Sequence, residues 1–214
     1  MRRPALAIAA ALALSSAAAA APVAFDGSWK TQRFSLFSSN DYGFGGDTLT
    51  VRSEGSVSLA YRPLPETLWT SQSASWAWAV DQGVPATDLR RKGGDDRNLA
   101  LYFVFLPAAE AERMKGSNVR KLLGNDSARV LVYVWGGDHR RGAVLPSPYL
   151  GARGKTVVLR PSGTGSARER VDLAGDYARA FGGDPGALVG LAVSGDSDDT
   201  DSRIDARISG LQLN

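Results

Sequence analysis

The sequence predicts an all-β protein, an antiparallel β-sandwich of jelly-roll-like type with two or three short helices. Residues 75–80, 99–106 and 130–135 are the most apolar runs after the N-terminal stretch, and they are rich in aromatic and β-branched side chains. Such residues favour buried strands. Polar, glycine-rich connections separate the runs. About nine or ten short strands, with turn signals at this spacing, are typical of a sandwich or a barrel.

The segment before the first apolar run predicts strands and turns in alternation. Phe34 and Leu36 fall on one face of a possible first strand, and residues 40–47 are expected to form a loop because they hold three glycines. Residues 48–61 alternate in polarity on both sides of a Ser-Glu-Gly turn, which predicts a hairpin with one wet face. Pro63 then ends the pairing, since proline cannot donate to a strand ladder.

Helices are expected at three places, residues 108–115, 119–123 and 173–181. The first follows a proline and has glutamates early and basic residues late, as the helix dipole favours. The last carries apolar side chains at i, i+4 and i+8 and ends at a pair of glycines. Residues 155–160, 188–193 and 204–213 complete the set of expected strands.

Residues 1–21 predict a secretory signal peptide. Two arginines, an apolar run and a small, Ala-rich stretch follow Met1 in the order that such leaders have. The apolar run, at about ten residues, is too short for a membrane-spanning helix. Residues 22–214 are therefore expected to form a single β-sandwich domain, exported to the periplasm or secreted, without a membrane span in its mature form.

Charge and cysteine content exclude several classes of protein. The net charge of +3 falls to +1 when Arg2 and Arg3 leave with the leader, so the mature domain has no electrostatic reason to bind nucleic acid. The chain has no cysteine, which excludes disulfides and a lipid-modified cysteine anchor. Its single histidine, His139, gives little support to a zinc site or a serine-hydrolase triad, and a surface loop is the expectation for it.

Tryptophans of the apolar runs are candidates either for the core or for a ligand platform. Trp76 and Trp78 project to the same face of a strand, and an exposed pair of this kind could stack on sugar rings. Their alanine neighbours make the other face apolar too, which favours a strand that is covered on both sides. Trp135, where a strand meets a glycine turn, is expected to reach a surface groove.

Acidic residues gather at two places. Asp196, Asp198, Asp199 and Asp201 lie within six residues, and such hard oxygen ligands suit Ca²⁺, although the spacing does not fit an EF-hand. A solvated acidic turn is the alternative. The neighbouring pair formed by residues 95 and 96 opens a central strand, where it serves either as a pair of catalytic carboxylates or, as we favour, as turn residues that bond to the preceding glycines.

The order of these motifs resembles a bacterial family of exported proteins known as domain of unknown function 3047. The resemblance covers roughly residues 68–213 and rests on these segments: Trp-Ala-Trp-Ala-Val at 76–80, Lys-Gly-Gly-Asp-Asp at 92–96, Val-Tyr-Val-Trp at 132–135, Ser-Pro-Tyr at 147–149, Asp-Tyr-Ala-Arg-Ala-Phe-Gly at 176–182 and Asp-Ser-Asp-Asp-Thr at 196–200. Asp199 stands where the family usually has an amide, and a tryptophan expected before residues 168–170 is absent. The resemblance implies an exported β-sandwich similar to jelly-roll carbohydrate-binding modules and implies no assigned activity.

Three hypotheses of function follow. The first is a non-catalytic module that binds a glycan or a cell-envelope polymer, with its groove formed by Trp135, Tyr149, Asp95, Asp96 and Asp176. The second is a polysaccharide hydrolase or lyase, which needs Asp95 or Asp96 to face Asp176 or Glu169 across a cleft. The third is a structural envelope protein that binds another protein and uses these motifs for packing alone.

Overall fold

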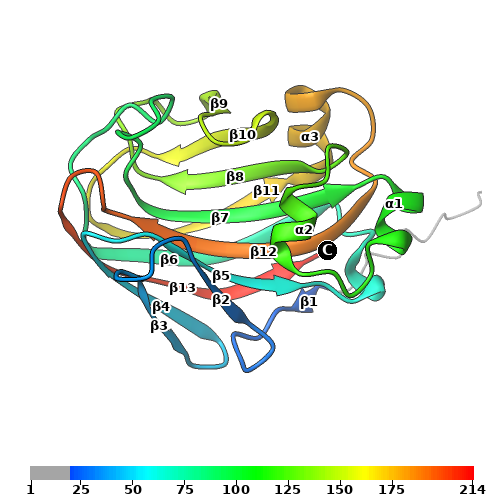
Figure 1. The fold of residues 1–214 in the computed structure, drawn as a ribbon, viewed down its shortest axis with the longest axis horizontal. Coiled ribbons are helices and arrows are strands. Elements are labelled where there is room, and N and C mark those ends of the chain that lie inside the picture. Colours follow the sequence, from blue (N-terminus) through cyan, green and yellow to red (C-terminus); the bar gives the residue numbers. More distant parts are fainter. Residues whose placement is uncertain (1–19) are drawn as a thin grey trace, which may run out of the picture.

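Two β-sheets pack face to face in the computed structural model, which describes residues 20–214 (Figure 1). The six-stranded sheet has the order β11-β6-β13-β4-β3, with β1 paired to β13. Its strands are β1 (Ala21–Pro22), β3 (Asp41–Phe44), β4 (Thr48–Glu54), β6 (Ser73–Gln82), β11 (Gly165–Asp172) and β13 (Arg203–Leu213). The predicted β-sandwich of jelly-roll-like type is confirmed.

The seven-stranded sheet has the order β2-β5-β12-β7-β8-β10-β9. Its pairings are antiparallel except between β8 and β10. Its strands are β2 (Lys30–Arg33), β5 (Ser58–Pro63), β7 (Arg97–Leu106), β8 (Arg129–Trp135), β9 (Val144–Ser147), β10 (Gly151–Arg160) and β12 (Ala187–Asp196).

Aromatic side chains fill the space between the two sheets. Trp76 and Trp78 of β6 are buried and meet edge to face, with ring centroids 5.4 Å apart. Trp78 also packs edge to face on Trp135 of β8, at 5.7 Å. Such contacts add to the free energy gained by burying the ring area. The preference for a core role of Trp76 and Trp78 over an exposed platform is therefore confirmed.

All three expected helices form, and they cover the sandwich at one end. The helices α1 (Ala108–Arg113) and α2 (Val119–Leu123) lie over the outer face of the seven-stranded sheet, beside the end of β7 (Figure 1). The helix α3 (Leu173–Phe181) starts at Asp172, whose side chain accepts a hydrogen bond from the Gly175 N–H. None of the helices in the described part of the chain is long and apolar enough to cross a membrane.

Three expectations for the N-terminal region are wrong. The hairpin predicted over residues 48–61 does not form, because β4 pairs with β3 and β13 in one sheet whereas β5 pairs with β2 and β12 in the other. Residues 40–47 contain strand β3 and not only a loop, because Gly43 pairs with Thr50 of β4, where an added Cβ atom would lie 2.4 Å from the Thr50 hydroxyl oxygen. Glycine permits the close approach that the strand needs. Phe34 and Leu36 do not share a strand face: β2 ends at Arg33, and the two side chains are 59% and 89% exposed.

The predicted signal peptide falls largely outside the described residues, which begin at residue 20. Ala21 and Pro22, where the leader was expected to end, form β1 and pair with Leu213 and Gln212 of β13. Export and the cleavage position stay predictions.

Candidate functional site

A cleft of about 480 Å³ lies on the outer face of the seven-stranded sheet. Side chains of β5, β12, β7, β8 and β10 form its floor, and α2 and the turns before β7 and after β9 form its walls. Its volume is in the usual range for ligand sites. Its aromatic lining residues are Phe34, Tyr61, Tyr102 and Tyr149.

Arg97 organises the polar end of the cleft. One nitrogen, Nη1, lies 2.9 Å from Asp95 Oδ2 and 2.9 Å from Asp196 Oδ2. The other, Nη2, donates to the Tyr102 hydroxyl at 2.9 Å, and that hydroxyl lies 3.0 Å from Ser194 Oγ. The two carboxylate oxygens share one nitrogen and therefore cannot be farther apart than twice 2.9 Å. Charge-assisted bonds of this kind hold the end of the cleft in one arrangement.

Burial shapes the protonation of this cluster. It raises the pKa of Asp196 to about 8, against the opposing effect of Arg97 and with further upward effects of Asp198 and Asp96. Burial alone would lower the pKa of Arg97, but Tyr102 and the two carboxylates hold it above its ordinary value. The second oxygen of Asp196, Oδ1, is buried and has no hydrogen-bond partner among the described residues.

Tyr149 joins two walls of the cleft. It lies in the turn between β9 and β10, and its hydroxyl donates to Asp95 Oδ1 at 3.1 Å. Desolvation and the Asp95 carboxylate raise the pKa of Tyr149 to about 12. The ring is still 56% exposed, and the Lys92 ammonium nitrogen lies 5.5 Å from its centroid. Tyr149 and Asp95, two of the expected groove residues, are therefore brought together.

Asp96 does not line the cleft and instead anchors the turn between β12 and β13. Its Oδ2 accepts hydrogen bonds from the Thr200 N–H at 2.7 Å and from the Thr200 hydroxyl at 2.5 Å. Its Oδ1 accepts from the Asp199 N–H at 3.3 Å. This fully buried carboxylate is therefore satisfied by donors of a distant turn and not, as expected, by the glycines that precede it.

The four aspartates that were candidate calcium ligands do not lie in one cluster. Asp196 bonds to Arg97, whereas Asp198 and Asp199 are exposed and offer oxygens that lie within 4.8 Å of an Asp96 oxygen. Asp201 is exposed and adopts a positive φ of 49°. The candidate cation set is thus Asp96 with Asp198 and Asp199, and calcium binding stays a prediction.

Two other expected groove residues lie on the inner face of the sheet. The expectation that Trp135 reaches a surface groove is wrong: it is 4% exposed and packs in the core between the sheets. Asp176 of α3 accepts a hydrogen bond from the Tyr133 hydroxyl at 2.6 Å and forms an ion pair with Arg179. Asp176 therefore contacts the inner face of β8 and does not line the cleft.

Glu169, the other carboxylate considered for catalysis, lies on β11 in the six-stranded sheet. It forms ion pairs with Arg141 and Arg160, both at 2.8 Å, and is 5% exposed. Since Glu169 and Asp176 do not line the cleft, neither faces Asp95 across it.

Arg97 and Tyr102 are site residues that the sequence analysis missed. The signal was present, since Arg97 is a charged residue at the start of a long apolar strand and Tyr102 is a polar-tipped residue within it. A buried charge of this kind needs partners, which makes it a candidate organiser of a polar cluster.

The family model for proteins of unknown function, DUF3047, matches residues 23–212. The chain belongs to this family. No curated protein is significantly similar to it in sequence. An engineered cellulase derived from Rhodothermus marinus has 12% identity and a TM-score of 0.45, over 92% of this chain and 99% of that chain.

The xyloglucanase domain of a type three effector from Sinorhizobium fredii, solved with cellobiose, has 11% identity and a TM-score of 0.42, over 93% of the DUF3047 chain and 97% of its own. A family 11 xylanase from Neocallimastix patriciarum has 13% identity and a TM-score of 0.38, over 87% and 99%. These values are too low to transfer a function to the DUF3047 chain.

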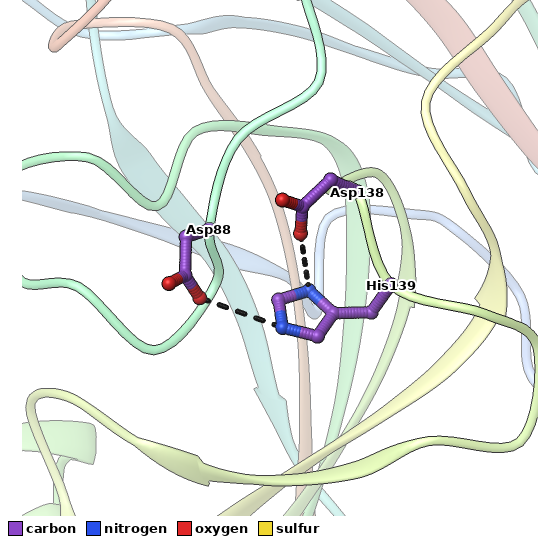
Figure 2. Close-up of side chains that lie close together, drawn as sticks. All are labelled: Asp88, Asp138 and His139. Atoms are coloured by element: carbon purple, nitrogen blue, oxygen red, sulfur yellow. Dashed lines mark ion pairs between the residues drawn. The ribbon is translucent and has the colours of Figure 1, made fainter.

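A second polar cluster of this DUF3047 protein lies around its histidine. Figure 2 shows the His139 ring between two carboxylates: Nδ1 is 2.8 Å from Asp138 Oδ1 and Nε2 is 3.4 Å from Asp88 Oδ1. The Asp88 carboxylate also accepts hydrogen bonds from Arg90, which hold the pKa of Asp88 well below its usual range. This cluster was not expected, since Asp88 comes from a part of the sequence far from Asp138 and His139.

Proposed function

We propose that this protein is a non-catalytic binding module whose cleft takes the saccharide part of a glycan or another cell-envelope molecule. The observation that carries the proposal is the open cleft, with aromatic rings along it and a carboxylate–guanidinium cluster at one end. Export to the periplasm or secretion, which the N-terminal sequence predicts, would place the module beside such molecules.

The chemistry of the cleft suits a sugar. The exposed ring of Tyr149 offers an apolar surface to the C–H face of a pyranose, and its hydroxyl is already held by Asp95. Asp196 lines the cleft, and a small shift of its side chain would let the buried, unpartnered Oδ1 bond to a sugar hydroxyl, which would relieve the cost of leaving that atom unpaired. A mostly apolar cleft with a few convergent polar groups is the usual form of a binding site.

Binding is favoured over catalysis because of how the carboxylates are held. Glycoside hydrolysis needs two carboxyl groups on opposite sides of the scissile bond. Asp95 and Asp196 instead bind the same nitrogen of Arg97, and each is more than nine-tenths buried. A hydrolase is the second candidate, favoured by the raised pKa of Asp196, which suits a general acid. Release of reducing ends from polysaccharide, lost in Asp196→Asn, would establish this second function.

A glycan array probed with the domain spanning residues 22–214 tests the proposal, with Tyr149→Ala and Phe44→Ala as a matched pair. Both rings are partly exposed, but Phe44 lies on β3 of the other sheet. We expect glycan binding that Tyr149→Ala weakens by about tenfold and Phe44→Ala leaves unchanged. An array without hits at high protein concentration, or equal losses in both variants, would contradict the proposal.

A further inference from the structure

We propose that the molecule bound in the cleft is an amphiphile, with an uncharged, hydroxyl-rich head at the Arg97 end and an apolar chain along the floor toward α2. The proposal rests on the proposed function for the sugar nature of the head. It adds the apolar chain and the orientation of the ligand.

The lining of the cleft changes in character along the strands. At one end, the register pairs Arg97 of β7 with Asp196 of β12, and at the other it pairs Val104 with Gly190. Arg97 and Val104 are seven positions apart along β7, which corresponds to about 23 Å. The turn between β12 and β13 lies at the polar end, opposite α1 and α2 (Figure 1).

The end beside α2 is lined mostly by apolar side chains. Its floor and wall are made by the side chains of Val104, Val119, Leu122, Val130 and Pro63. Arg62 also lines this end, but its guanidinium donates to the Ala24 carbonyl oxygen at 3.0 Å. A long polar chain placed here would lose its hydrogen bonds to water, so an apolar chain is the better occupant.

Small residues of the central strand give such a chain room. Gly190 and Ala192 of β12 line the cleft between the larger side chains of β5 and β7. A Cβ atom added to Gly190 would make only one close approach, an ordinary contact of 3.5 Å with the Arg62 carbonyl oxygen. A side chain at Gly190 would therefore begin without a clash and extend into the cleft that this residue lines.

The polar end favours hydroxyl groups over an ionic head. The Arg97 nitrogens are committed to Asp95, Asp196 and Tyr102, so they offer no free fork to a phosphate or a sulfate. Asp198 adds another carboxylate to the lining, which repels anions. Burial raises the pKa of Asp196, which reduces the negative charge available to a cation.

Calorimetric titration with three probes tests the proposal: maltose, dodecyl maltoside and dodecyltrimethylammonium, each alkyl probe below its micelle concentration. Each methylene group that leaves water favours binding about fourfold, so we expect dodecyl maltoside to bind at least about tenfold more tightly than maltose and than the cationic probe. Equal affinity for maltose and dodecyl maltoside would overturn the amphiphile but leave a glycan-binding function. Equal or tighter binding of the cationic probe, or no binding of dodecyl maltoside, would overturn the proposal.

A substitution on the floor locates the chain. Gly190→Leu should remove the preference for dodecyl maltoside over maltose, while Gly27→Leu, the same change at an exposed glycine with open space around it, should keep it. Val119→Ser on α2 is a smaller change and should reduce the preference for dodecyl maltoside over maltose. It therefore tests the same point if Gly190→Leu does not fold. An undiminished preference in a folded Gly190→Leu or Val119→Ser variant would contradict the proposal.

Discussion

The seven-stranded sheet carries a Tyr–Asp–Arg cluster on each of its faces, and the two clusters differ in what surrounds them. On the inner face, Tyr133 is fully buried and bonds to Asp176, which Arg179 covers. On the outer face, Tyr149 is 56% exposed and bonds to Asp95, which a buried Arg97 holds. The same three residue types therefore support packing in one place and line a cleft in the other.

The two clusters differ in how deeply the arginine side chain is buried. The Arg179 side chain is 64% exposed, so water screens its charge and its ion pair contributes little to the free energy of folding. The Arg97 side chain is 12% exposed and bonds to two buried acidic side chains, so its removal leaves the Asp95 charge without compensation and Asp196 without its hydrogen-bond donor.

The largest effect is expected from removing the buried arginine. Arg97→Met should lower the free energy of unfolding by about 3 kcal/mol, because it leaves Asp95 and Asp196 buried without their partner. Arg179→Met, the matched change on the inner face, should cost less than about 1 kcal/mol. Urea unfolding of the two variants measures both values. Equal losses would show that the two clusters are energetically alike.

Removing the hydroxyl of Tyr133 should lower the stability of the fold, whereas removing that of Tyr149 should weaken ligand binding. Tyr133→Phe removes the donor to the buried Asp176 carboxylate and should cost about 1–2 kcal/mol of unfolding free energy without changing affinity for a ligand in the cleft. Tyr149→Phe also removes a donor to a buried carboxylate, but water in the open cleft can replace it, so the unfolding free energy should change by less than about 0.5 kcal/mol. Ligand binding should weaken, because Asp95 no longer holds the ring in place. Urea unfolding and calorimetric titration of both variants test this, and the reverse pattern would contradict the assignment of the cleft.

The assignment of these aspartates to faces shows where sequence reasoning reached its limit. Asp95 and Asp176 were both placed in one groove, yet they lie on opposite faces of the sheet. The face of Asp95 depends on a register shift at the start of β7, where the three steps from Arg97 to Ala100 oppose only the two from Asp196 to Ser194. No residue pattern in β7 indicates this extra residue. Trp135, by contrast, could have been placed correctly. It lies two and four positions after Tyr133 and Leu131, so it shares their face of the strand, which is turned toward the core.

Secondary structure was predicted best where a periodic pattern of apolar residues is bounded by residues that begin or end an element. The helix α3 has the predicted bounds, because its apolar stripe is followed by two glycines and preceded by Asp172. Strand β3 was missed because glycines signal turns, and only the tertiary pairing reveals that Gly43 fits against Thr50. Local chemistry thus predicted the elements and the sandwich, while the cleft depends on contacts between distant residues.

The protonation of Asp196 should make the stability of the polar end depend on pH. Its pKa of about 8 in the folded protein exceeds the ordinary value of 3.8, so between these values the folded chain holds a proton that the unfolded chain has released. The contribution of Asp196 is thus complete below about pH 4 and is lost as the pH rises through about 8.

Asp196→Asn should flatten this dependence. Between pH 5.5 and 8.5, the wild-type protein should lose at least about 1 kcal/mol more unfolding free energy than Asp196→Asn. Asp81→Asn, which removes an exposed carboxylate from the six-stranded sheet, should keep the wild-type slope. Urea unfolding at several pH values measures the slopes. Parallel curves for wild type and Asp196→Asn would mean that Asp196 is ionised throughout this range.

The smallest effect is expected from calcium, because the acidic turn is already held by its own hydrogen bonds. Asp96 accepts three of them and Asp196 is committed to Arg97. The exposed carboxylates that lie close to Asp96 are those of Asp198 and Asp199, so a cation there would gain few free ligands. We expect the melting temperature in calcium and in chelator to differ by less than about 1 °C. A rise of several degrees in calcium that the Asp198→Asn, Asp199→Asn double variant abolishes would instead establish a cation site. The bound calcium ion would also add a fixed positive charge beside the polar end of the cleft. The cleft would then favour a ligand with an anionic head over one with a neutral head.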